Sequence, residues 1–271
     1  MSLSSLDIKD YKTFAQRLAD AARRQTLPRF RQNAAVFNKA GPWFDPVTDA
    51  DREGERVQRD MIEGLYPDHG IVGEEFGVTK GAGAFRWVLD PVDGTRAFVC
   101  GIATWTTLIA LEYQEKPVLG LIDQPFTDEC WLADTEQTTY IHADKSSPAK
   151  TSGVTSLDKA RISTTDPRPS AYFSESEALA FEKVASRSRL VRFSMDAYAY
   201  GLLALGELDA VIETGLLHHD YASLAPVVEG AGGVITNWRG DPLGTDGRGE
   251  TVAVATPELH AEILSVLNEA G

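Results

Sequence analysis

The stretch WVLDPVDGTR, residues 87–96, ends an apolar run with two aspartates three positions apart. The apolar residues predict a buried strand, and the proline and glycine after them predict a tight loop at its exit. Because Pro91 fixes the backbone directly after Asp90, the side chains of Asp90 and Asp93 can face a common point. The carbonyl of Val92 can be turned the same way. Such oxygen atoms on a short loop are the ligands that Mg²⁺ prefers, although the segment could also be only a polar turn between strands.

The residues after the second aspartate favour a phosphate at the same loop. Gly94 lets the backbone approach a ligand closely. Thr95 can begin a short helix, TRAFV, whose free N–H groups would face an anion. The loop therefore combines groups suited to a cation with groups suited to a phosphate.

Three further acidic clusters lie at the ends of predicted strands or helices. Each has an ordinary explanation, namely surface charge, favourable interaction with a helix dipole, or a helix N-cap. Together with the first loop they favour a site for several metal ions. They are GEEFG (73–77) with Glu74 and Glu75, VTDADRE (47–53) with Asp49 and Asp51, and HHDYASLAPVVEGAGG (218–233) with Asp220.

Composition restricts the class of protein. The chain has 271 residues, 43% of them hydrophobic, which suffices for one large or two medium domains. Its formal charge of -14 disfavours nucleic acid as a partner and suits divalent cations. Cys100 and Cys130 lack zinc-type spacing and are typical of reduced thiols in a cytoplasmic protein. We expect neither a signal peptide nor a membrane-spanning segment.

Hydrophobic periodicity predicts an α+β first half. Helices are expected at 6–24 and 49–66, joined by a loop or irregular hairpin. The second helix should bury a stripe formed by Val57, Met61, Ile62 and Leu65. A run of strands then follows, at 71–75, 86–90, 104–113, 117–124, 129–134 and 138–144.

The second half is predicted to be an α/β layer. Residues 145–159 are rich in Ser, Pro, Gly and Thr, which indicates a junction between domains 1–150 and 151–271. Beyond the junction, strands and helices alternate. The strands are expected at 160–165, 189–194, 209–214, 233–238 and 251–255, and the helices at 174–187, 196–207, 220–232 and 257–270.

The acidic motifs, in this order, resemble the inositol monophosphatase superfamily of Mg²⁺-dependent sugar and polyol phosphatases. The family pattern is GEE, an apolar strand running into DPxDGT, and a C-terminal WDxA followed by EAGG. The resemblance covers nearly the whole chain and implies a layered αβαβα fold with the site between two domains. Two departures are His219, where the family commonly has Trp, and EGAGG around Glu229 in place of EAGG.

The resemblance also implies a role for each matching residue. Asp51 and Thr95 would orient and deprotonate the attacking water, and the amides of Gly94 and Thr95 would bind phosphate. Glu213 would face the hydroxyl or amine end of the substrate. Glu74 would also take part in catalysis, and Asp93 and Asp220 would also contact the substrate or its phosphate. The metal ligands, for two or three Mg²⁺ ions, would be Glu74, Asp90, the Val92 carbonyl, Asp93 and Asp220.

Within this family the chain is similar to the histidinol-phosphate phosphatase branch. The similarity rests on DGTRAF, FDPVTDADR and MDAYAYGLLALGELD (195–209), in which Asp196 would lie beside the substrate with Tyr198 near it. Histidinol phosphate carries an ammonium and an imidazole, which carboxylates at Asp196 and Glu213 would complement. Asp196 could instead be a helix N-cap, and Arg96 could bind phosphate or form a surface ion pair. Of the histidines, only His219 is worth a mutation.

Two alternative functions stay open at this point. One is an inositol-1-monophosphatase or a broad polyol phosphatase, for which extra negative charge in the site brings no advantage. The other is a catalytically silent protein that binds a phosphorylated metabolite. In each case the partner is a small phosphate monoester, and a homodimer is expected by analogy with related proteins.

Overall fold

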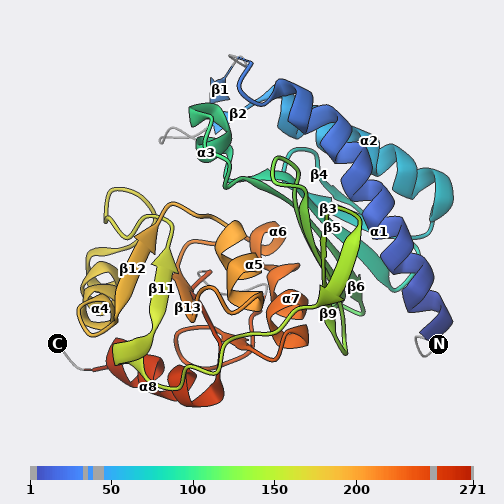
Figure 1. Ribbon diagram of the computed structural model, residues 1–271. Helices are drawn as coiled ribbons and strands as arrows, with labels where there is room; N and C mark the ends of the chain where they lie inside the picture. Colours follow the sequence, from blue (N-terminus) through green and yellow to red (C-terminus); the bar gives the residue numbers. More distant parts are fainter. Residues whose placement is uncertain (1–4, 33–35, 39–45, 245–248, 270–271) are drawn as a thin grey trace.

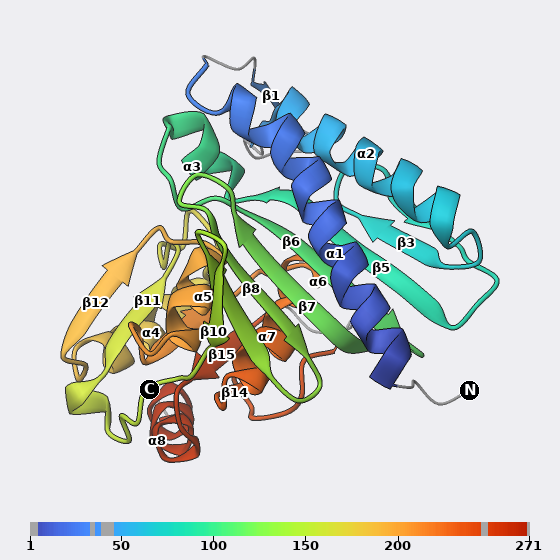
Figure 2. The same cartoon turned by 45° about the vertical axis from the view of Figure 1, so that its right-hand side comes forward.

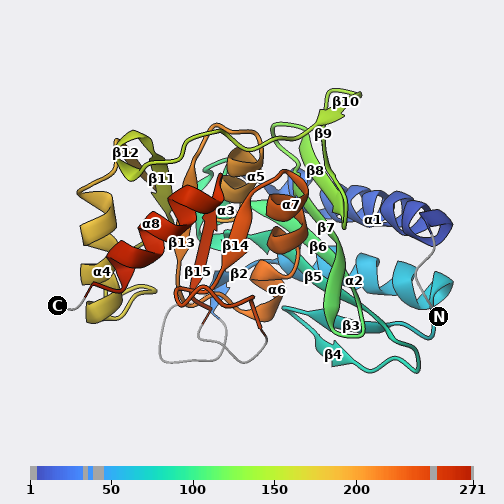
Figure 3. The ribbon, with the colours of Figure 1, turned by 90° about the horizontal axis from the view of Figure 1, so that it is seen from below.

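Two β-sheets organise the chain, and helices cover their outer faces and fill the space between them (Figure 1). The computed structural model describes residues 5–32, 36–38, 46–244 and 249–269. Helices α1 (Ser5–Thr26) and α2 (Asp49–Leu65) lie side by side across the outer face of the larger sheet (Figure 2). Seen from below, the layers succeed one another as helix, sheet, helix, sheet and helix (Figure 3). The fold is therefore the predicted αβαβα arrangement.

The larger sheet has eight strands in the order β10-β9-β8-β7-β6-β5-β3-β4. Neighbouring strands are antiparallel except β3 and β5, which are parallel. The predicted hairpins between residues 104 and 142 are confirmed, whereas β4 and β10 were not predicted. The strands are β3 (Gly70–Gly73), β4 (Gly77–Thr79), β5 (Phe85–Asp93), β6 (Thr106–Tyr113), β7 (Lys116–Gln124), β8 (Glu129–Asp134), β9 (Thr138–His142) and β10 (Lys145–Pro148).

The smaller sheet has five strands in the order β12-β11-β13-β15-β14. Its first three strands are parallel, and β15 is antiparallel to both of its neighbours. The strands are β11 (Arg161–Thr164), β12 (Leu190–Phe193), β13 (Ala210–Glu213), β14 (Val234–Thr236) and β15 (Thr251–Val254). Helices α5 (Tyr198–Ala204), α6 (His218–Tyr221) and α7 (Leu224–Gly230) lie between the sheets, and α4 (Glu175–Ala185) and α8 (Pro257–Leu267) cover the far face.

Three apolar clusters fill the spaces between the layers. The middle cluster takes residues from both halves of the chain, so the two sheets share one core. Strands β3 to β10 belong to the larger sheet and strands β11 to β15 to the smaller one, and we retain domains 1–150 and 151–271 as a proposal. Representative members are Phe14, Leu18 and Trp87 under α1 and α2, Ile122, Trp131 and Leu203 between the sheets, and Phe181, Val254 and Ile263 under α4 and α8.

The buried face of α2 differs from the prediction. Leu65 is 51% exposed, and of the predicted stripe only Ile62 is fully buried. The face that meets the sheet instead carries polar and charged side chains, among them Asp51, Glu55 and Arg59. A period of 3.6 residues locates the faces of a helix but cannot show which polar groups find partners inside the fold.

The predicted helix over 220–232 is two helices, α6 and α7, separated by a turn. Pro226 explains the break, because a proline lacks the amide hydrogen and its ring collides with the carbonyl four residues earlier. The segment between α1 and α2 contains a short 3₁₀ helix (Leu27–Arg29) and the paired strands β1 (Phe37–Asn38) and β2 (Pro46–Val47). The rest of this expected irregular hairpin lies outside the described residues. Among the described helices, none is long and apolar enough to cross a bilayer.

Candidate active site

Strand β5 brings the DPVDG loop to the edge of the larger sheet. Its pairing with β6 shifts register between Asp90 and Asp93, which interrupts the strict alternation of side chains. Asp90 is buried, and its Oδ1 accepts a hydrogen bond of 3.0 Å from the amide of Val92. Gly94 then turns the chain with a φ of 79°, a conformation that favours glycine. The two carboxylates lie together near the end of the strand as predicted, but the predicted end of the strand at residue 90 is wrong, because β5 continues through Pro91 to Asp93 and the turn begins at Gly94.

Glu74 comes to the same edge because β3 runs parallel to β5. Gly73 pairs with Leu89, so Glu74 follows the end of β3 next to Asp90, which still pairs with Leu108 of β6. The amide of Glu74 donates to the carbonyl of Leu89 at 3.2 Å. The carboxyl groups of Glu74 and Asp90 are within hydrogen-bonding contact. The predicted strand 71–75 thus ends at Gly73, and Glu74 belongs to the turn that follows.

Asp220 reaches this edge from the second half of the chain. It is the third residue of α6 and not its N-cap, which is Leu217. Its Oδ2 accepts the amide hydrogen of Leu217 at 2.6 Å, and Nε2 of His219 lies 3.4 Å from its Oδ1. The preceding His218 contacts the buried carboxylate of Glu112 on β6 at 2.7 Å, which holds α6 against the larger sheet.

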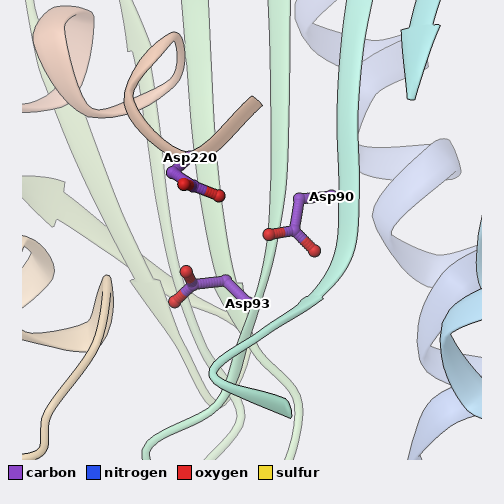
Figure 4. A group of neighbouring side chains, drawn as sticks. All are labelled: Asp90, Asp93 and Asp220. Atoms are coloured by element: carbon purple, nitrogen blue, oxygen red, sulfur yellow. The ribbon is translucent and has the colours of Figure 1, made fainter. Parts of the chain in front are cut away.

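Asp90, Asp93 and Asp220 form a compact carboxylate group (Figure 4). One oxygen of each lies within 4.8 Å of the others, and the three side chains point toward a common centre. The amide of Ala197 donates to Asp93 Oδ2 at 2.8 Å, which fixes the orientation of that side chain. We call these three residues and Glu74 the metal cluster.

The charges of the metal cluster repel one another. Burial and the neighbouring charge of Glu74 raise the pKa of Asp90 well above its usual range. Burial and the charges of Asp196 and Asp220 raise the pKa of Asp93 in the same direction. Like charges at short distance inside a protein are unfavourable unless a proton or a cation lies among them. All four residues offer hard oxygen atoms, so the donor set fits Mg²⁺.

Asp51 and Thr95 meet next to the metal cluster. Asp51 is the third residue of α2, and its Oδ2 accepts hydrogen bonds from the amide (2.8 Å) and the hydroxyl (2.6 Å) of Thr48. Its Oδ1 lies 3.2 Å from the hydroxyl of Thr95, which is also 3.1 Å from the carbonyl of Val92. Burial raises the pKa of Asp51. The carboxylate of Asp51 therefore helps to cap the N-terminus of α2 with one oxygen and contacts Thr95 with the other.

Two more carboxylates line the same cavity, whose volume is about 370 Å³. Burial raises the pKa of Asp196 to about 6, even though the positive charge of Arg96 opposes the shift. Asp196 is not an N-cap, because α5 begins two residues later and Asp196 itself has a φ of 48°. Burial raises the pKa of Glu213 to about 8, and this side chain accepts hydrogen bonds of 2.8 Å from the amide and the hydroxyl of Thr165.

Arg96 and Tyr172 also line the cavity. The guanidinium of Arg96 lies 4.9 Å from the centre of the Tyr172 ring, a cation–π contact. We call Asp196, Glu213, Arg96 and Tyr172 the substrate cluster. Sequence reasoning missed Tyr172 because it lies in a connection whose polar residues and prolines indicate only a loop. It also missed Thr165, which was expected as the last residue of the strand 160–165 and directly follows β11. The structure brings every predicted site residue to this cavity or to its wall.

A comparison with known protein families matches residues 7–271 to the inositol monophosphatase family. The chain belongs to this family. IMPL2, a bifunctional chloroplastic phosphatase of Arabidopsis thaliana, is 38% identical over 88% of this chain and 67% of its own. The histidinol-phosphatase of Streptomyces coelicolor is 33% identical over 97% of this chain and 98% of its own. An inositol monophosphatase from Zymomonas mobilis has the same fold, with a TM-score of 0.85 and 37% identity over 98% of this chain and 99% of its own.

Membership of the inositol monophosphatase family establishes the reaction class. The protein is a phosphatase that hydrolyses phosphoric monoesters of small molecules, and the family is metal-dependent. The acidic group of Asp90, Asp93 and Asp220 is the part of the cavity that could hold metal.

Proposed function

We propose that this inositol monophosphatase family member uses Mg²⁺ to hydrolyse L-histidinol phosphate to histidinol. The observation that carries the proposal is the pair of buried carboxylates, Asp196 and Glu213, in the same cavity as the metal cluster. Asp196, with a pKa of about 6, is mostly ionised at neutral pH, and a cationic group beside Glu213, whose pKa is about 8, would favour its ionised form. The pair therefore suits a substrate that carries positive charge as well as a phosphate. The similarity to a named histidinol-phosphatase supports the same choice.

In this proposal the metal cluster and the Val92 carbonyl hold two or three Mg²⁺ ions. When bound, Mg²⁺ supplies Lewis-acid activation of water and neutralisation of the phosphate charge. Asp93 and Asp220 line the same cavity as the substrate cluster, and in this proposal they contact the substrate or its phosphate as well as the metal. The amides of Gly94 and Thr95 would donate to the phosphate oxygens, as glycine permits close approach there.

Asp51 and Thr95 would move the proton of the attacking water. A hydroxyl has one proton, so when Thr95 donates to Asp51 its lone pairs are free to accept a hydrogen bond from water. Asp51 is held by Thr48 through its other oxygen, so it does not rotate away. Its raised pKa makes Asp51 a better proton acceptor than an exposed aspartate. The water is thereby oriented for direct attack on phosphorus, without a covalent enzyme intermediate.

Asp196 and Glu213 would bind the ammonium and imidazole of the substrate. Glu213 is fixed by Thr165, so its position does not depend on the substrate. Arg96 is held over Tyr172 and lies close enough to Asp196 to affect its pKa. In this proposal the positive charge of Arg96 balances the negative charge of Asp196 until the cationic group of the substrate takes the place of Arg96.

The test is a comparison of kcat/KM for L-histidinol phosphate and for inositol 1-phosphate, with Mg²⁺ and with EDTA. We expect a preference for histidinol phosphate of at least about tenfold, because charge-assisted hydrogen bonds contribute roughly 1.5–3 kcal/mol. The preference should fall in Glu213→Gln. A preference for inositol phosphate would overturn the substrate and leave the reaction class in place. No Mg²⁺-dependent release from any monoester would favour a silent phosphometabolite-binding protein.

The second candidate is an inositol-1-monophosphatase or broad polyol phosphatase. It is favoured by the likeness to the inositol monophosphatase from Zymomonas mobilis. A neutral polyol needs hydrogen bonds but gains nothing from the charge of Asp196. Asp196→Asn therefore separates the two candidates, since it should leave a polyol phosphatase nearly unchanged.

We also propose a homodimer. The edge strand β12 exposes Leu190 and Phe193, and both line a surface depression with Ile102. Exposed apolar side chains gathered at a sheet edge favour contact with a second copy. Light scattering should give twice the chain mass, and Phe193→Glu should reduce it, whereas a monomeric parent would contradict the proposal. The expected cytoplasmic location stays a prediction.

A further inference from the structure

Outside the cavity, Glu55 is a buried charged side chain that the chemistry above does not use. It lies one helical turn after Asp51 on the inner face of α2, and it is fully buried. A buried carboxylate is unfavourable unless it is paired and hydrogen-bonded. Its partners therefore indicate what it is for.

Both oxygens of Glu55 contact the turn that carries Glu74. Oε2 accepts the amide hydrogen of Glu75 at 2.6 Å, and Oε1 accepts that of Phe76 at 3.2 Å. The charge is balanced by Arg59, whose Nε donates to Oε1 at 2.7 Å. Arg59 also donates to the Thr79 hydroxyl at 3.0 Å and to the carbonyl of Gly77.

The strand before Glu74 is shaped to admit this carboxylate. A Cβ atom added at Gly73 would lie 1.9 Å from Oε1 of Glu55, which no packing allows. The φ of Gly73 is not in the left-handed region, so space, and not backbone conformation, is what requires glycine here. Glu74 is therefore fixed on both sides, by β5 through Leu89 and by α2 through the two amides that follow it.

We propose that Glu55 is a positioning residue that orients the carboxylate of Glu74 toward the three aspartates of the metal cluster. The inference rests on the proposed function, because it takes Glu74 as a metal ligand. The first half of α2 thereby serves the site twice: Asp51 contacts Thr95, and Glu55 orients the turn of Glu74. The competing explanation is that Glu55 and Arg59 only attach α2 to the sheet.

Isothermal titration of the full chain with Mg²⁺ separates these explanations. In Glu55→Gln the new amide group cannot accept, so one of the two backbone N–H groups loses its partner. We expect Mg²⁺ to bind about tenfold more weakly, within the 10–100-fold range for groups that orient metal ligands. The rate at saturating Mg²⁺ should fall much less than the Mg²⁺ affinity. The matched control is Glu53→Gln on the same helix, since the side chain of Glu53 is 38% exposed and pairs with Arg56.

Glu74→Gln makes the outcomes distinguishable. If Glu74→Gln and Glu55→Gln both weaken Mg²⁺ binding and Glu53→Gln does not, the inference is supported. If only Glu74→Gln weakens it, Glu55 has a purely structural role and the inference is overturned, while the proposed function stands. If Glu74→Gln has no effect, the ligand set itself is wrong. Should Glu55→Gln not fold, Arg59→Lys replaces it. We expect this variant to bind Mg²⁺ about three- to fivefold more weakly, a smaller effect than the 10–100-fold range for groups that orient metal ligands. An unchanged Mg²⁺ affinity would contradict the inference.

Discussion

The metal cluster and the substrate cluster share one cavity but are built differently. In the metal cluster, one carboxylate oxygen each of Asp90, Asp93 and Asp220 lies within 4.8 Å of the others, and burial together with neighbouring carboxylates raises the pKa of Asp90 and Asp93. In the substrate cluster the carboxylates have partners in the protein: Arg96 lies near Asp196, and Thr165 holds Glu213. The first group gathers carboxylates at one point and therefore suits metal ions, whereas the second combines two carboxylates with the basic side chain of Arg96 and therefore suits an organic group that carries charge.

This difference separates catalysis from selectivity. Removing a member of the metal cluster should affect every substrate alike, because all phosphate monoesters need the same charge stabilisation. Removing a member of the substrate cluster should affect substrates according to their charge. The following predictions test this separation, from the largest expected effect to the smallest.

Asp90→Asn should lower kcat/KM for every substrate by about 10³–10⁴-fold, since several kcal/mol of charge stabilisation depend on the metal. Initial-rate measurements with histidinol phosphate and a generic aryl phosphate check it. Asp60→Asn, an exposed position on α2, is the control. Turnover of Asp90→Asn close to that of the parent protein would refute the assignment of the metal cluster.

Thr95→Ala should lower kcat by about 10²-fold, the lower range for a group that orients and transfers a proton. Thr95→Ser keeps the hydroxyl near Asp51 and should restore most of the rate. Mg²⁺ affinity should change little in either variant. Equal losses in both variants would show that the methyl group, and not the hydroxyl, is what matters.

Mg²⁺ should stabilise the fold more at high pH than at low pH. Because the pKa values of Asp90 and Asp93 are raised, the metal-free folded protein keeps protons on these groups at a pH at which the unfolded chain has lost them. Their contribution to the free energy of unfolding is therefore fully present at low pH and is lost as the pH rises through the raised pKa values. Mg²⁺ at 100 times its Kd adds about 2.7 kcal/mol, or roughly 5–10 °C in Tm. Thermal unfolding at pH 5.5 and 8, with Mg²⁺ or EDTA, measures this, and an equal gain at both pH values contradicts it.

Asp196 should contribute to substrate choice only when ionised. Because its pKa is about 6, the carboxyl group of Asp196 is mostly negatively charged above pH 6 and mostly neutral below it. The ratio of kcat/KM between the parent and Asp196→Asn, for histidinol phosphate, should rise from near one at pH 5 to about ten at pH 7.5. The same ratio for inositol 1-phosphate should stay flat. A ratio independent of pH would place the ammonium elsewhere.

The motifs were predictable because their geometry is local. Asp90, Val92, Asp93 and Gly94 are neighbours at the end of β5 and the turn after it, so proline, glycine and strand periodicity suffice to place them together. The order of helices and strands followed from periodicity for the same reason. The break between α6 and α7 was missed, although Pro226 was a visible signal for it.

Other features needed the assembled structure. The charged inner face of α2 contradicts the amphipathic pattern, because Glu55 finds its partners in a turn about twenty residues further along the chain. Tyr172 meets Arg96 only across the cavity. No local rule reports such distant pairs, since whether a buried polar group is satisfied depends on what surrounds it in space.

By itself, the sequence determined the family and the carboxylates near the end of the strand, because the motifs that carry them are short runs of neighbouring residues, and the layered fold followed from the resemblance to that family. Only the tertiary structure decided that Asp90, Asp93 and Asp220 face one centre with Glu74 beside Asp90, through the parallel pairing of β3 with β5 and the contact between His218 and Glu112. The physical reason is that charge repulsion, burial and pKa depend on distances between side chains, and folding alone sets those distances.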